Sequence, residues 1–233
     1  MDDQNAIHTL ASLYVTGEYL TQDYAKSLQI LSDAKSEEAI FLRASIYYKD
    51  WEGRNLDRAK DEFEYLANRY ANSDAMLFLG FIYQDDNYQF KDINTANQWF
   101  EESSRKGNST AKLMLSLNYI NGVGVIRNHE KAYLLARDCA FPNNLDCYTA
   151  MGVILLNGEY KNRIDLGVTI LMDAKNRGDE LAGRTLEAAK NDPSLAHNFR
   201  NNSVMSQIRR NVRRLGREEL STVLLIIDSS LNN

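Results

Sequence analysis

Five blocks of similar sequence follow one another along most of the chain, at a spacing of about 36 residues. Each block starts with a small residue, and a second small residue follows five positions later. A tyrosine stands eight positions after the start in four of the five blocks. The starts are Ala6, Ala39, Ala75, Ala111 and Cys147, the second small residues are Ala11, Ala44, Gly80, Ser116 and Gly152, and the last column reads Tyr14, Tyr47, Tyr83, Tyr119 and Leu155. Self-similarity at this period predicts a solenoid of stacked helix pairs.

Each block is predicted to form two antiparallel helices joined by a turn. A second column of small residues (Ala25, Ala59, Ala96, Ala132 and Gly167) marks the second helix of each pair. Small residues at fixed positions let two helix backbones approach closely, and a larger residue there would strain the packing. The predicted helices cover residues 5–16 and 22–35, 38–50 and 56–70, 74–85 and 93–106, 109–121 and 129–140, 146–157 and 163–176, and finally 181–191.

This pattern resembles the Sel1-like repeats, which are relatives of the tetratricopeptide repeats. The fourth block carries it best, with Ala111, Ser116, Tyr119, the Gly-Val-Gly turn at 122–124 and Ala132. The second and third blocks depart from it in the turn. The resemblance implies a right-handed α-solenoid of five to six helix-turn-helix repeats over residues 1–193, closed by a C-terminal helical cap at 194–233. It also implies a protein that binds other proteins in a concave groove.

Charge is divided unevenly along the chain. The formal net charge is −5, but residues 194–233 hold six arginines against three carboxylates, so the first 193 residues carry about −8. The acidic solenoid disfavours a nucleic-acid partner. No apolar run is long enough for a membrane span, and residues 1–5 do not read as a signal peptide, although a leader removed before the first repeat would leave the same start.

The arginine-rich tail allows two interpretations. Apolar residues at helical spacing in 203–216 and 218–231 predict two short helices, which would cap the open end of the solenoid. The alternative is a docking site for an acidic partner or for lipid headgroups.

Two cysteines, Cys139 and Cys147, stand eight positions apart, at the end of one predicted helix and the start of the next. A short loop between antiparallel helices brings such positions within disulfide distance. The spacing is also similar to that of the cysteine-rich secreted Sel1-like proteins, which implies a bond between neighbouring helices and an oxidising compartment. The alternative is a pair of buried free thiols in a cytoplasmic protein. A metal site is not expected, because two cysteines without a nearby histidine provide too few ligands.

The sequence carries no recognisable catalytic motif and implies no cofactor. The three histidines, His8, His129 and His197, are far apart, and no phosphate loop, nucleophile elbow or zinc motif occurs. Aromatic residues outside the repeat pattern, with a nearby arginine, are instead candidates for partner binding, because aromatics and arginine dominate interface energetics. These candidates are Arg43, Tyr48, Trp51, Tyr88 and Phe90.

The favoured hypothesis is a non-catalytic envelope protein, periplasmic or secreted, that binds another protein in its groove. One version resembles the exported repeat proteins that act as immunity proteins against secreted antibacterial effectors. Another is an envelope scaffold or a regulator of signalling or surface polysaccharide. An enzyme acting on a cell-wall or β-lactam ligand is the competing class, and a cytoplasmic adaptor is a further alternative. The oligomeric state is not predicted.

Overall fold

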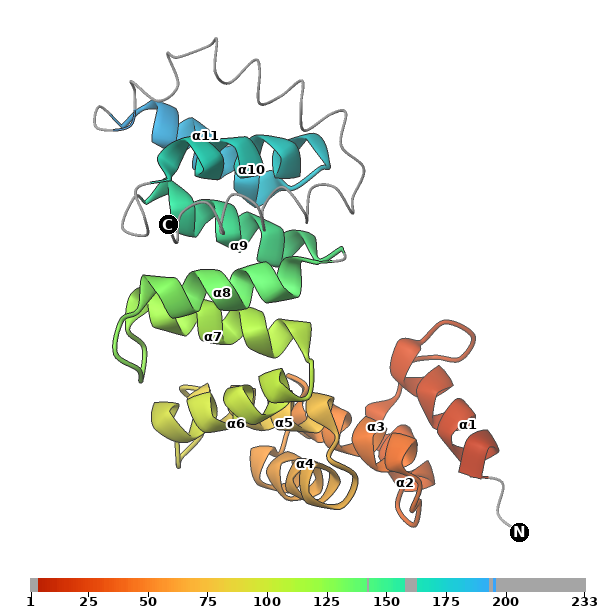
Figure 1. The fold of residues 1–233 in the computed structure, drawn as a ribbon. Helices are drawn as coiled ribbons and strands as arrows, with labels where there is room; N and C mark the ends of the chain where they lie inside the picture. The colour runs from red at the N-terminus through yellow and green to blue at the C-terminus, as the bar shows by residue number, and fades with distance from the viewer. Residues whose placement is uncertain (1–3, 142, 158–162, 193–194, 196–233) are drawn as a thin grey trace. The chain divides into compact units, whose positions relative to one another are not determined.

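The computed structural model describes residues 4–141, 143–157, 163–192 and 195, and every regular element within them is an α-helix. Ten of these helices form five consecutive pairs, and an eleventh follows them (Figure 1). The pairs are α1 (Gln4–Thr16) with α2 (Tyr24–Ile30), α3 (Glu37–Tyr48) with α4 (Leu56–Tyr70), α5 (Ser73–Gln84) with α6 (Ile93–Arg105), α7 (Ser109–Asn121) with α8 (His129–Ala140) and α9 (Leu145–Leu156) with α10 (Ile164–Asn176), followed by α11 (Glu180–Lys190). The predicted all-α solenoid of helix pairs is confirmed.

One predicted helix is much shorter than expected. Residues 22–35 were expected to be helical, but α2 ends at Ile30. It begins where expected, because the Asp23 side chain accepts from the Lys26 backbone N–H at 2.8 Å. Beyond its end, the Leu31 carbonyl accepts from the Ala34 backbone N–H at 3.1 Å, and the carbonyls of Leu31, Ser32 and Ala34 also accept from the Arg43 guanidinium. A side chain of the next pair therefore holds the turn that follows this helix.

Five first helices begin with the same capping contact. In each, a polar side chain three positions before the block start accepts from the backbone N–H of the block-start residue. The pairs are Ser36 with Ala39 (3.3 Å), Asn72 with Ala75 (2.8 Å), Asn108 with Ala111 (3.0 Å), Asn144 with Cys147 (3.0 Å) and Asp179 with Ala182 (2.8 Å). This column of caps sets the start of the helices along the solenoid.

The column of small residues at the second marked position is buried throughout, as predicted. Two contacts show its use. The Ser116 hydroxyl donates to the Ala132 carbonyl at 2.8 Å, and the Ser27 hydroxyl donates to the Ala11 carbonyl at 3.0 Å. Each bond ties the two helices of one pair at a position where their backbones are close.

Contacts divide the chain into two compact units, residues 1–111 and 112–233. In the first unit, an aromatic group holds α3, α4 and α5 together. The ring of Phe63 stacks on Phe78 at 4.9 Å between centroids, and Phe41 meets both rings edge-on. This unit also carries both of the pockets described below.

The second unit is built around α9. Nine of its twelve residues are buried, among them Met151 and Ile154. Leu195 packs against the same core, but the rest of the predicted cap, residues 194–233, lies outside the described residues. Among the helices of the described part, none is long and apolar enough to cross a membrane.

Candidate functional site

A first pocket lies on the first helices of three successive pairs. Its volume is about 410 Å³, and α1, α3 and the start of α5 contribute the side chains that line it. Phe41 and Leu42 supply apolar surface, while Glu37, Glu38 and Asp74 supply carboxylates. The remaining lining residues are His8, Ser45 and Asn72.

The carboxylates of this pocket are held by the capping residues of the repeats. The Asn72 side-chain amide donates to Glu37 at 2.8 Å, and the Asn108 amide donates to Asp74 at 2.7 Å. Both carboxylates stand in the first turn of their helix, where the helix dipole favours negative charge. Glu38, beside them, is exposed. The pocket is therefore an apolar patch bordered by fixed negative charge.

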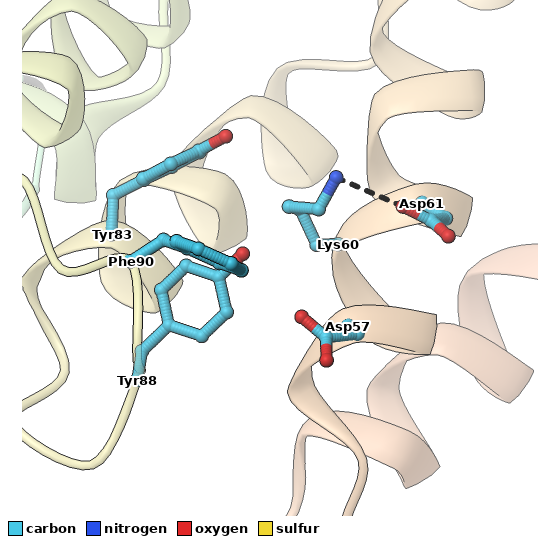
Figure 2. Close-up of a pocket in the computed structure, with 6 residues that line it drawn as sticks. All are labelled: Asp57, Lys60, Asp61, Tyr83, Tyr88 and Phe90. Atoms are coloured by element: carbon cyan, nitrogen blue, oxygen red, sulfur yellow. Dashed lines mark ion pairs between the residues drawn. The ribbon is translucent and has the colours of Figure 1, made fainter.

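A second pocket, of about 440 Å³, lies between α4 on one side and the end of α5 with the chain that follows it on the other (Figure 2). Tyr83, Tyr88 and Phe90 gather on one side of it. Adjacent rings meet edge-on, Tyr83 with Tyr88 and Tyr88 with Phe90, each pair at 5.8 Å between centroids. Across from them, α4 presents Asp57, Lys60 and Asp61.

Carboxylates surround the cation of this second pocket. The Lys60 ammonium lies 2.9 Å from Asp61 and 3.4 Å from Glu64, and hydrogen bonding to Asp61 raises the pKa of Lys60 above its usual range. The Tyr83 hydroxyl donates to Glu64 at 3.4 Å. Burial, and next the charge of Glu64, raise the pKa of Tyr83. The wall formed by α4 is thus negative overall, and it disfavours an anion in the pocket.

The structure brings together two of the five residues proposed from sequence for partner binding. Tyr88 and Phe90 line the second pocket, but they differ in exposure: Tyr88 is 5% exposed and Phe90 is 63% exposed. Tyr88 is therefore a buried part of the pocket wall, whereas Phe90 presents its ring to solvent.

The other three lie at junctions between helix pairs. Arg43 donates to Glu62 at 2.7 Å and to the Leu31 carbonyl at 2.6 Å. The Trp51 indole N–H donates to the Ile46 carbonyl at 2.9 Å, and its ring packs on Tyr24 at 5.3 Å between centroids. Tyr48 meets Phe78 edge-on at 5.2 Å. These contacts give each of the three a part in packing the repeats.

Sequence reasoning overlooked the lining of the first pocket. Glu38, Phe41 and Asp74 stand at ordinary helix positions and carry no motif. A usable signal exists, since the same face of successive first helices recurs at the repeat period. Comparing that face across repeats would have shown acidic and apolar residues gathered in the second and third blocks.

The predicted disulfide is confirmed. Cys139 at the end of α8 is bonded to Cys147 in the first turn of α9, with 5.7 Å between the two Cα atoms. Both side chains are almost fully buried. In the described residues, no group of three histidine, cysteine or carboxylate side chains is placed to hold a metal ion.

A family model for the Sel1 repeat matches residues 5–34, 73–108 and 109–137. These segments coincide with the pairs α1–α2, α5–α6 and α7–α8 described above. The chain contains Sel1 repeats. The pairs α3–α4 and α9–α10 continue the same series between and after the matched Sel1 segments. Sel1 repeats typically form non-catalytic scaffolds for protein–protein interaction.

Solved Sel1-repeat structures share this fold. A Sel1 repeat protein from Oxalobacter formigenes has a TM-score of 0.69 at 17% identity, over 91% of this chain and 88% of its own. A protective antigen from uropathogenic Escherichia coli, which displays an SLR fold, has a TM-score of 0.68 at 18% identity over 80% of this chain. The match spans 41% of the length of that antigen. No curated protein matches the sequence.

Proposed function

We propose that this chain binds a basic protein partner in the pocket on its first helices. The observation that carries the proposal is that pocket itself, in which apolar side chains of α3 lie beside carboxylates of α3 and α5. Phe41 and Leu42 offer contact area to an apolar side chain, while Glu37, Glu38 and Asp74 attract flanking lysines or arginines.

The location we propose is the cell envelope, either periplasmic or secreted. The Cys139–Cys147 bond supports it, because disulfides persist in oxidising compartments. Within the envelope, the partner class we propose is a secreted antibacterial effector that this chain would neutralise as an immunity protein. The observation that supports this role is the acidic pocket, whose carboxylates would attract a basic surface on such an effector.

The binding site is tested with a charge reversal. Glu38→Lys places a cation on the edge of the pocket at an exposed position. Tagged full-length protein is isolated from the periplasm of its native host after mild crosslinking, and captured proteins are quantified by mass spectrometry. We expect a partner that the wild type captures and that Glu38→Lys captures at least about tenfold less.

The matched control is Glu130→Lys. Glu130 is also an exposed acid in the first turn of a helix, so its reversal costs a similar loss of dipole interaction, but it does not line the pocket. Equal capture by the wild type and Glu38→Lys, or equal loss in both variants, would place the binding surface elsewhere.

The immunity role has its own test. A candidate effector encoded beside this chain is expressed in the periplasm with and without it. Protection by the wild type and loss of protection by Glu38→Lys would support neutralisation through the pocket. Unchanged toxicity with the wild type would exclude that effector as the partner.

A further inference from the structure

The tyrosine that recurs in four of the five blocks has a partner that the sequence pattern did not show. In three blocks, a cation from the second helix of the same pair lies over the ring of this tyrosine. Lys26 lies 4.6 Å from the centroid of Tyr14, Arg58 lies 5.4 Å from that of Tyr47, and Lys131 lies 5.3 Å from that of Tyr119. All three distances are in the range of a cation–π interaction.

The cation occupies the same place in each of these pairs. It stands three residues after the residue that caps the second helix, namely Asp23, Asn55 and Asn128. The backbone N–H of each cap also donates to the carbonyl of the corresponding tyrosine, at 2.8–2.9 Å. One local geometry therefore fixes the tyrosine, the cap and the cation together.

The third block keeps this geometry and lacks the cation. Asp92 caps α6, and its N–H donates to the Tyr83 carbonyl at 2.9 Å. Three residues later stands Thr95, whose hydroxyl donates to Asp92 at 2.6 Å. Threonine carries no charge, so the second helix of this pair cannot place a cation on Tyr83 from that position. The pocket of Figure 2 lies at this same tyrosine.

The other walls of this pocket favour a cation. Tyr88 and Phe90 extend the aromatic surface next to Tyr83, and the exposed ring of Phe90 forms its outer edge. Asp57 supplies a carboxylate across from the rings, and it accepts a long hydrogen bond from the neutral Gln89 side chain at 3.5 Å. Aromatic faces beside a carboxylate form a typical site for a cationic group.

Lys60 does not take the place of the missing cation. Its ammonium lies against Asp61 and Glu64, on the α4 side of the pocket. Because two carboxylates surround this single ammonium, Lys60 does not reverse the negative character of the wall.

We propose that the pocket formed by Tyr83, Tyr88, Phe90 and Asp57 receives an arginine side chain of a protein partner. The partner's guanidinium would approach Tyr83 from the side of α4, whereas the cations over the other three tyrosines come from the second helix of the tyrosine's own pair. Arginine fits better than lysine, because its planar guanidinium stacks on an aromatic ring and pairs with a carboxylate at the same time. This site is separate from the first-helix pocket and does not depend on the function proposed for that pocket.

The probe is the peptide acetyl-Gly-Arg-Gly-amide, compared with the same peptide in which neutral citrulline replaces arginine. Binding to the full chain is followed at low salt by the aromatic ¹³C–¹H signals of Tyr83, Tyr88 and Phe90. We expect saturable shifts with the arginine peptide at millimolar concentration and at least about fivefold weaker binding of the citrulline peptide. Equal binding of both peptides, or no saturable shift, would overturn the proposal.

The variant Thr95→Lys tests the same idea from within the chain, because it restores the residue type that the first and fourth blocks carry at this place. Its ammonium should lie over Tyr83 and weaken binding of the arginine peptide at least about tenfold without loss of helicity. Thr95→Ser is the matched control, since it keeps the hydroxyl that donates to Asp92 and should bind within about twofold of wild type. Wild-type affinity in Thr95→Lys would contradict the assignment of the site.

Removal of the exposed ring gives an independent check. Phe90→Ala should weaken binding of the arginine peptide about fivefold. Because the Phe90 ring is exposed, we expect the variant to stay folded, so that weaker binding reports the loss of the ring. Unchanged affinity in a folded Phe90→Ala variant would also count against the proposal.

Discussion

The Nη1 of Arg43 donates to the carbonyl oxygen of Leu31 at 2.6 Å, across the junction between the first and second helix pairs. The Nε of the same side chain donates to Glu62 on α4 at 2.7 Å. One guanidinium therefore satisfies the end of the first pair while it neutralises a partly buried carboxylate of the second.

Arg43→Ala should lower the free energy of unfolding by about 2–4 kcal/mol, because it leaves both the Leu31 carbonyl and Glu62 without this donor. Burial raises the pKa of Glu62 even though Arg43 opposes the effect. A carboxyl whose pKa is raised in the folded chain favours folding as the pH falls, so the variant should lose less stability at pH 5 than at pH 8.

Urea denaturation of the full chain at the two pH values measures this effect. The double variant Arg43→Ala, Glu62→Gln removes the charge that Arg43 neutralised and should recover part of the loss. If the double variant is as unstable as the two single changes added together, the pair is not coupled.

The Arg54–Asp85 ion pair joins the second and third helix pairs and predicts sensitivity to acid. Burial alone would raise the pKa of Asp85, but the backbone N–H of Asn87 and the Arg54 guanidinium outweigh it and hold the pKa below its usual range. The stabilisation is therefore fully present above the unfolded-state pKa of about 3.9, and it is lost as the pH falls through the folded-state pKa.

Asp85→Asn should accordingly cost about 1 kcal/mol at pH 7 and much less near pH 3. Chemical denaturation of the wild type and the variant at both pH values checks this convergence. Asp50→Asn, at an exposed position outside the pair, serves as the control and should differ little from wild type at either pH. A gap for Asp85→Asn that persists at pH 3 would show that the loss does not arise from its charge.

Two glycines in helix interiors should respond in opposite directions to alanine. A Cβ at Gly167 in α10 would lie 2.5 Å from the Leu156 backbone nitrogen and 2.8 Å from the Gly152 carbonyl oxygen. These are backbone atoms that cannot rotate away, so Gly167→Ala should cost about 2 kcal/mol or more. A Cβ at Gly183 in α11 would come no closer than 3.7 Å to a lysine side chain, so Gly183→Ala should stabilise by about 0.5–1 kcal/mol.

Thermal unfolding followed by circular dichroism distinguishes the two variants. A midpoint that rises for Gly183→Ala and falls for Gly167→Ala is the expected result. A fall of similar size in both midpoints would mean that the close approach of α9 and α10 is not the reason why alanine destabilises the chain at position 167.

The disulfide should contribute about 2–3 kcal/mol, because it closes a loop of nine residues between α8 and α9. Denaturation with and without reductant measures this contribution. The variant Cys139→Ala, Cys147→Ala should show the reduced value in both conditions, since alanine fits buried positions of this size. Reductant sensitivity in that variant would point to an effect unrelated to the bond.

Much of the fold could be predicted from the sequence because it is set locally and repeated. The small residues that allow close helix approach and the polar caps before most of the helices act within one pair, so their spacing is visible in the chain. The end of α4 shows the limit. Ala71 adopts a left-handed conformation with φ 53°, and no glycine marks it.

The candidate site was only partly predictable. Tyr88 and Phe90 were chosen because they are aromatic and outside the repeat pattern, and both line a pocket. The same criterion selected Trp51, whose indole instead bonds the Ile46 carbonyl and packs on Tyr24 of the preceding pair. Residue type does not distinguish a ring that faces solvent from one that packs between repeats, since both need a large apolar side chain.

The sequence by itself determined the helix pairs and their order, because these follow from residue spacing within one repeat, and it favoured a bond between the two cysteines across one short turn without excluding free thiols. Only the tertiary structure decided which side chains meet between repeats. Arg43 reaches the preceding pair, and Tyr83 of α5 lines one pocket with Asp57 and Lys60 of α4. Such contacts depend on how one pair stacks on the next, and that stacking brings together residues whose separation in sequence carries no signal of their contact.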